Sequence, residues 1–82
     1  MREDTRRRSP REYTKEDRAN ALAELNDKTK AVISFIDACI LLDMASQTGY
    51  YLARKGQFPG AKRVGDVWKV TRETLRAFLY DD

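Results

Sequence analysis

Residues 46–70 have the sequence SQTGYYLARKGQFPGAKRVGDVWKV, and this stretch decides the fold. Its first ten residues have the spacing of an amphipathic helix, and Gly56 follows where a left-handed C-terminal cap is expected. Beyond Gly60 the period changes, because two short segments flank the dipeptide Gly65-Asp66. A two-residue turn that begins with glycine suits a type II′ hairpin. The stretch therefore predicts a helix followed by a β-hairpin.

A second helix is expected just before this stretch. Ser34 followed by Asp37 resembles a capping box, with aspartate in place of the preferred glutamate. The helix should end near Asp43, and the next should begin at Ala45 or Ser46. The apolar face of the helix that starts at Ser34 consists of Phe35, Ala38, Cys39, Leu41 and Leu42. Two helices joined by about three residues are typical of a helix-turn-helix.

The hairpin is followed by one more helix. Thr71 is a suitable N-cap, and Glu73 lies near the positive end of the helix dipole. Leu75, Phe78 and Leu79 should face inward. The expected fold is mostly α with a small β-hairpin wing: a winged helix-turn-helix domain over residues 33–82.

Two segments precede this domain. Residues 1–14 have almost no apolar side chains, so we expect a disordered basic tail, whose Arg6-Arg7-Arg8 run is either a phosphate contact or an ordinary charged tail. Residues 15–32 are rich in helix formers and predict an extra N-terminal helix. Its apolar stripe would consist of Ala19, Leu22, Ala23 and Leu25.

The composition excludes several functional classes. The chain has 82 residues, a length that allows one small domain. It contains no histidine and the single cysteine Cys39. These counts exclude the usual zinc sites, Ser-His and Cys-His nucleophile pairs and an internal disulfide. No apolar run approaches the roughly 18 residues of a membrane-spanning helix. We expect a soluble, cytoplasmic protein that is not an enzyme and has no metal, cofactor, small-molecule ligand or membrane partner.

The positive charge is concentrated in the C-terminal half. Residues 46–76 hold seven basic and two acidic residues, whereas residues 19–45 hold two basic and four acidic ones. A basic segment of this density favours a polyanion as partner. The other interpretation is a solvated surface that only aids solubility.

The helix that begins at residue 46 separates into two faces. Ala45, Gly49 and Leu52 form the inner side, where Gly49 allows close approach of the preceding helix. Glutamine can bond adenine and arginine can bond guanine bidentately, while tyrosine and lysine commonly contact phosphates. The candidate DNA-binding residues are Ser46, Gln47, Tyr50, Tyr51, Arg54 and Lys55 on this helix and Lys62, Arg63 and Lys69 on the hairpin.

The aromatic residues have an alternative role. Tyr50 and Tyr51 are also suited to covering a thin core. Trp68, flanked by Val67, is expected in the core rather than as a platform for base stacking, with Val64 facing the same side.

Residues 33–79 resemble the excisionase-like, MerR-related helix-turn-helix domains. The similarity lies in SFIDACILL at residues 34–42, TGYYLARKGQFP at residues 48–59, and VGDVWKV followed by TRETLRAFL at residues 64–79. The sequence departs from the family pattern at Gly49, which replaces a β-branched core residue, at Asp43, which replaces a turn glycine, and at Ala45, which replaces a capping serine.

The resemblance implies a function. In this family the second helix enters the major groove, the wing contacts the adjacent backbone or minor groove, and the base-reading positions correspond to Gln47, Tyr51 and Arg54. Small members of the family are often phage or prophage excisionases (recombination directionality factors). These bind repeated DNA sites cooperatively, bend the DNA and assist a tyrosine integrase in a bacterial host. Two alternatives stay open: a small regulator that dimerises through residues 15–32, and an adaptor that binds protein through Tyr50 and Tyr51.

Overall fold

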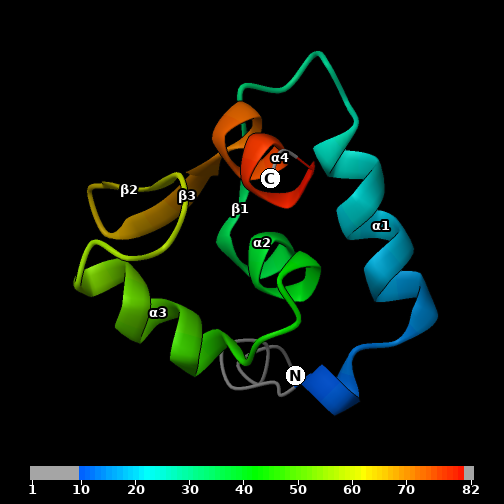
Figure 1. Ribbon diagram of the computed structural model, residues 1–82, viewed down its shortest axis with the longest axis horizontal. Coiled ribbons are helices and arrows are strands. Elements are labelled where there is room, and N and C mark those ends of the chain that lie inside the picture. Colours follow the sequence, from blue (N-terminus) through cyan, green and yellow to red (C-terminus); the bar gives the residue numbers. More distant parts are fainter. Residues whose placement is uncertain (1–9, 81–82) are drawn as a thin grey trace.

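The computed structural model describes residues 10–80, which fold into four α-helices and a three-stranded antiparallel sheet (Figure 1). The elements are a 3₁₀ turn (Pro10–Glu12), α1 (Lys15–Leu25), β1 (Val32–Ser34), α2 (Phe35–Leu41), α3 (Ser46–Arg54), β2 (Ala61–Val64), β3 (Val67–Thr71) and α4 (Arg72–Tyr80). Helix α2 lies in the middle, with α1 on one side and α3 and the β2–β3 hairpin on the other (Figure 1). The expectation of a mostly helical fold with a small β-hairpin is confirmed. Across residues 10–80, no helix combines the length and apolar character needed to cross a membrane.

The N-terminal segment differs from the expected tail and long helix. The Arg6-Arg7-Arg8 run lies outside the described residues, but residues 10–14 are part of the fold and Tyr13 is buried. Thr14 and Asp17 form a capping box that starts α1. The helix ends at Leu25 rather than at residue 32, because the Asp27 carboxylate accepts hydrogen bonds from the backbone and side chain of Thr29 and closes a turn.

The buried face of α1 is also different from the expected stripe. Ala21 and Leu25 are fully buried, whereas Leu22 is 42% exposed and Ala19 and Ala23 are exposed. Ala21 and Leu25 are four residues apart and therefore lie on one face of the helix. The chain before residue 33 thus packs on the rest of the domain rather than standing apart from it.

The sheet contains one strand that the sequence did not indicate. The strand order is β1-β3-β2, and Ile33 of β1 pairs with Val70 of β3. A three-residue strand is too short to show a periodic pattern. The predicted hairpin is present, with Val64 opposite Val67 and a positive φ of 64° at Gly65, as the first central position of a type II′ turn requires.

This register puts Val64 and Trp68 on opposite faces, contrary to the expectation. Val64 pairs directly with Val67, and Trp68 pairs with Arg63 one position further from the turn. Since successive side chains of a strand alternate between faces, Trp68 points to the core side and Val64 away from it. Trp68 is half-buried 6.2 Å from the ring of Phe35, which agrees with a packing role.

Helix α4 packs through fewer apolar residues than expected. Leu75 is fully buried and Leu79 is half-buried, but Phe78 is 60% exposed. The third member of the buried face is Arg72, which precedes Leu75 by three residues and Leu79 by seven. Phe78 is therefore turned away from the core.

Gly49 makes the predicted close approach between α2 and α3. A Cβ at this position would lie 2.5 Å from Cys39 Sγ, 3.2 Å from Phe35 and 3.3 Å from Phe58. Cys39 is fully buried, and burial raises the pKa of its thiol to about 12, so it stays protonated and acts as a small core residue. The close contact fixes the position of α3 against the domain.

Candidate nucleic-acid interface

The outer face of α3 presents polar and basic side chains. Gln47, Tyr51 and Arg54 follow one line along the helix and are exposed, Tyr51 to 54%. Lys55 follows the last turn, where its ammonium lies 3.4 Å from the Tyr51 hydroxyl and 5.2 Å from the centre of the Tyr51 ring. A cation over an aromatic face restrains both groups. This face can therefore offer an amide, a phenol and two cations to a partner.

Two candidate residues of α3 lie away from this face. The Ser46 side chain is fully buried at the start of the helix. Tyr50 is half-buried and stacks on Phe35, with ring centres 4.5 Å apart. Tyr50 therefore has the packing role that the alternative interpretation gave it, and neither residue is placed for contact with a large partner.

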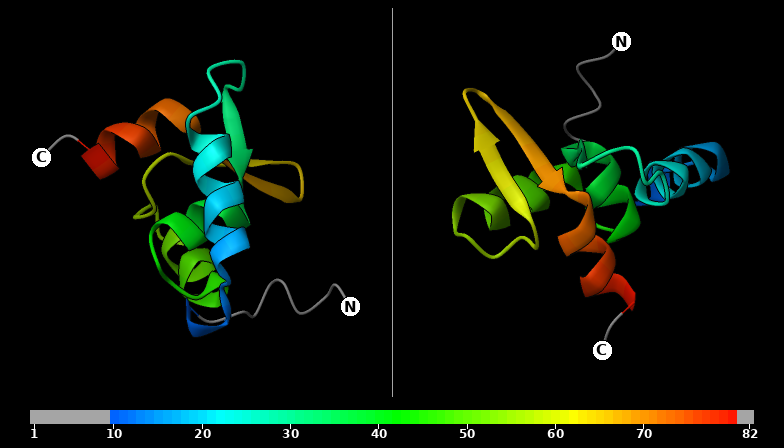
Figure 2. Two further views of the ribbon diagram at one scale, coloured as in Figure 1. Left: turned by 90° about the vertical axis from the view of Figure 1, so that its right-hand side faces the viewer. Right: turned by 90° about the horizontal axis from the view of Figure 1, so that it is seen from above.

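Phe35 connects α3 to the hairpin. Besides Tyr50 of α3, its ring contacts Phe58, at 4.6 Å between ring centres, and Trp68 of β3, at 6.2 Å. Phe35 and Phe58 are themselves buried. One aromatic cluster thus fixes the helix and the hairpin relative to each other. Both lie on the side of the molecule opposite α1 (Figures 1 and 2).

The hairpin contributes three basic residues in two arrangements. Lys62 and Lys69 are cross-strand partners on the face that points away from the core. Arg63 donates a hydrogen bond from Nε to the carbonyl of Gly65 at 3.0 Å and lies 3.9 Å from the Asp66 carboxylate. An exposed ion pair of this length contributes little energy, so Arg63 mainly braces the turn while both lysines stay available.

The turn between α2 and α3 is supported by the N-terminal segment. Asp43 has a φ of 57°, a left-handed conformation that glycine adopts more readily than other residues. Arg18 of α1 forms an ion pair with Asp43 at 3.1 Å, and the Tyr13 hydroxyl donates a hydrogen bond to the carbonyl of Met44 at 2.8 Å. Ala45 caps α3 without a side-chain hydrogen bond. The segment before β1 therefore helps to position α3.

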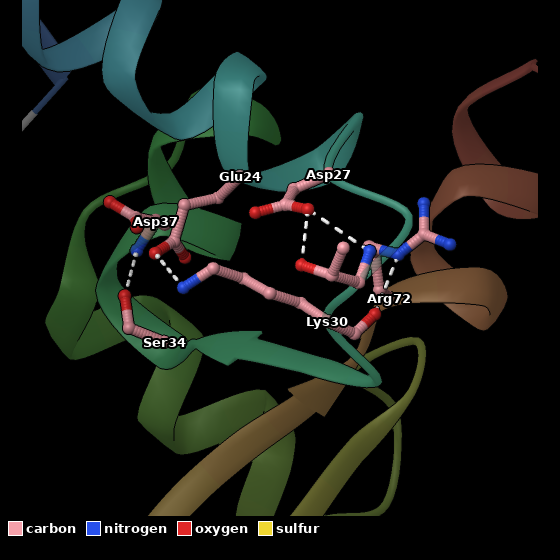
Figure 3. Close-up of polar contacts among 7 residues, drawn as sticks. Glu24, Asp27, Lys30, Ser34, Asp37 and Arg72 are labelled. Carbon is pink, nitrogen blue, oxygen red and sulfur yellow. Dashed lines mark hydrogen bonds and ion pairs between the residues drawn. The ribbon is translucent and has the colours of Figure 1, made fainter.

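Arg72 is a structural residue rather than part of the basic surface. Its side chain is 6% exposed and pairs with Glu73. It donates hydrogen bonds to the carbonyls of Leu25 and Lys30, both at 2.8 Å, and Figure 3 shows the one to Lys30. It thereby ties α4 to the loop after α1. The sequence signal was its helical spacing from Leu75, which puts both residues on the buried face.

A pair of carboxyl groups lies between α1 and α2 (Figure 3). Burial, followed by the proximity of Glu24, raises the pKa of Asp37 to about 6. Burial would raise the pKa of Glu24 too, but hydrogen bonds from Asp37 and Lys30 outweigh it and lower that pKa. Asp37 therefore takes up a proton at a higher pH than an ordinary aspartate, beside a Glu24 carboxylate that pairs with Lys30 at 3.2 Å. The backbone N–H of Asp37 also donates to Ser34 Oγ, as the predicted cap requires.

The basic candidate residues gather on two neighbouring elements. Arg54, Lys55, Lys62, Arg63 and Lys69 lie on α3, directly after it or on the hairpin, where Asp66 is the acidic residue. Comparison of the chain with protein-family models, with curated proteins and with solved structures found no match. The function therefore has to be inferred from these residues and their geometry.

Proposed function

We propose that this protein binds double-stranded DNA through a winged helix-turn-helix, in which α2 and α3 are the two helices and the β2–β3 hairpin is the wing. The observation that carries the proposal is the exposed line of Gln47, Tyr51 and Arg54 on a helix that is fixed beside a basic hairpin. Polar side chains are normal on the outer face of any amphipathic helix; the support here is that an amide, a phenol and a guanidinium can hydrogen-bond base edges and phosphates.

The dimensions of α3 fit the major groove. An α-helix with its side chains is about 10–12 Å across, and the groove is about 12 Å wide. Gln47 and Arg54 are seven residues apart, about 10 Å along the axis, which corresponds to about three base-pair steps. In this arrangement Gln47 and Arg54 hydrogen-bond base edges, Tyr51 lies between them, and Lys55 reaches the phosphate backbone.

The biological role that we propose is that of an excisionase. The resemblance of residues 33–79 to this class is its support, and it implies cooperative binding along repeated sites, DNA bending and an integrase of the tyrosine class as partner. The dimeric regulator gains no support from α1, because Ala21 and Leu25 on its apolar face are buried within its own chain. The adaptor keeps only Tyr51 as an exposed anchor, since Tyr50 stacks on Phe35.

The test begins with the selection of bound duplexes from a random library by the full chain. Footprinting on the enriched sequence then measures the layout of the sites. Protection that grows over tandem repeats supports the excisionase role, and a single two-fold symmetric footprint supports the regulator instead. Failure to enrich any sequence, at low and at moderate salt, would overturn the DNA-binding proposal and leave the adaptor.

A further inference from the structure

Two valines are uncovered at the tip of the hairpin. Val64 and Val67 lie directly opposite each other on either side of the Gly65-Asp66 turn. They are 67% and 52% exposed, and no other large apolar side chain between residues 10 and 80 is more exposed than Val64. A cross-strand pair of β-branched side chains forms one continuous apolar contact surface.

The hairpin holds this pair in a fixed direction. Arg63 braces the turn through its hydrogen bond to the carbonyl of Gly65. On the opposite face, Trp68 packs near Phe35 and anchors β3 to the body of the domain. The tip therefore projects outward without having to be ordered by a partner, and the hairpin stands clear of the helices in Figure 2.

Cations lie behind the valines on the same face. Lys62 and Lys69 are the next cross-strand pair on the face that carries the valines. This pair lies two residues further from the turn, about 7 Å from the valine pair. Two adjacent lysines repel each other, and an anionic partner relieves that repulsion. The hairpin face is thus apolar at its tip and cationic behind it. The minor groove of DNA has the complementary arrangement, with sugar rings lining its walls and phosphates at its edges.

We infer that Val64 and Val67 pack against the deoxyribose rings of the minor groove beside the α3 site, with Lys62 and Lys69 on the flanking phosphates. This inference rests on the proposed function and adds to it an apolar contact that is insensitive to salt. Electrostatic contacts set the salt dependence of affinity, whereas burial of methyl groups does not.

The test compares Val64→Thr and Val67→Thr with Val32→Thr. Threonine keeps the branched shape of valine, and Val32 is a matched control because it is 43% exposed on the same side of the sheet but in β1. Affinity for the selected duplex is measured by fluorescence anisotropy at several salt concentrations. Each tip variant should bind about fourfold more weakly, the effect of one buried methyl-sized group, with an unchanged salt slope. Lys62→Ala should reduce the salt slope by about one.

The outcomes separate this inference from the proposed function. If both tip variants bind as tightly as Val32→Thr while Arg54→Ala weakens binding, the valine contact is wrong and DNA binding by α3 stands. If Arg54→Ala has no effect, the proposed function fails. If Val64→Thr turns a DNA-free dimer into a monomer in sedimentation velocity, the valines bind a second copy of this chain and the inference is overturned. Unchanged circular dichroism melting curves verify that the variants are folded.

Discussion

Gly49→Ala is the most informative perturbation of the fold, because the site for the added atom is known. The new Cβ would lie 2.5 Å from Cys39 Sγ, closer than such atoms approach in proteins. It would also lie 3.2 Å from Phe35 and 3.3 Å from Phe58, and both rings belong to the core. The clash therefore has to be relieved by moving α3 or by repacking the aromatic cluster.

The net effect follows from two opposing contributions. Alanine in place of glycine within a helix stabilises by about 0.5–1 kcal/mol. Inserting a methyl group into a packed core costs about 1–3 kcal/mol. The two ranges combine to a net loss of about 0–2.5 kcal/mol, and the 2.5 Å approach to Cys39 Sγ favours the upper half of it. In a domain of this size each 1 kcal/mol lowers the melting temperature by about 4–8 °C.

Thermal and urea unfolding of five proteins measure this effect. They are the wild type, Gly49→Ala, Cys39→Ala, the double variant, and Thr48→Ala as an exposed control on the same helix. Removing Sγ takes away the nearest obstacle, so the double variant should lose less stability than the sum of the single losses, with a coupling of about 0.5 kcal/mol or more. A Gly49→Ala variant as stable as Thr48→Ala, or additive losses, would refute the close packing of α3 on α2.

Three further predictions concern groups that stabilise the domain. Arg72→Ala should cost at least about 3 kcal/mol of unfolding free energy, since each of its two hydrogen bonds to a carbonyl is worth about 1.5–3 kcal/mol. Arg76→Ala on the exposed side of α4 is the control. Equal melting temperatures for the two variants would contradict the structural role of Arg72. The pKa of Asp37 is raised from 3.8 to about 6, so the folded chain binds the extra proton and loses stability as the pH rises through that window. Asp37→Asn should flatten this decline in melting temperature, and an unchanged slope would be evidence against the raised pKa of Asp37. Tyr13→Phe should cost about 1 kcal/mol of unfolding free energy, measured by urea unfolding, because the hydrogen bond to the Met44 carbonyl is lost. No loss would mean that the N-terminal segment does not stabilise the turn between α2 and α3.

The sequence predicted the elements whose signals are local. Ser34 as a cap, Gly56 in the left-handed conformation with a φ of 74°, and the turn at Gly65 were all confirmed, because each depends on a few adjacent residues. Gly49 was predicted as a close approach, since it interrupts the inner face of a helix, and the distance to Cys39 agrees.

The features that the sequence did not reveal depend on contacts between distant residues. Strand β1 exists because it pairs with β3, and three residues carry no period of their own. Tyr13 is buried beside Ala21 and Ile40 and donates a hydrogen bond to the carbonyl of Met44, 31 positions away, although it follows a highly charged segment. Arg72 was counted as surface charge because its carbonyl partners come from a loop more than 40 residues earlier. Composition alone cannot identify such partners.

The candidate interface was predicted best where helical spacing decided it. Gln47, Tyr51 and Arg54 lie on one exposed line, as their spacing required. Ser46 and Tyr50 were assigned from residue type and adjacency, and the structure places the first in the core and the second against Phe35.

The central claim is that the exposed face of α3 binds DNA specifically. Its most direct test is an anisotropy titration of wild type, Arg54→Ala and Lys15→Ala onto the selected duplex at moderate salt with excess random competitor. Lys15→Ala is the matched control, because it removes the same charge from an exposed position at the start of α1, on the opposite side of the molecule. We predict that Arg54→Ala weakens specific binding by about 5- to 150-fold, from the loss of a bidentate contact worth about 1–3 kcal/mol, and that Lys15→Ala binds like wild type. Equal affinities for all three proteins would contradict the account.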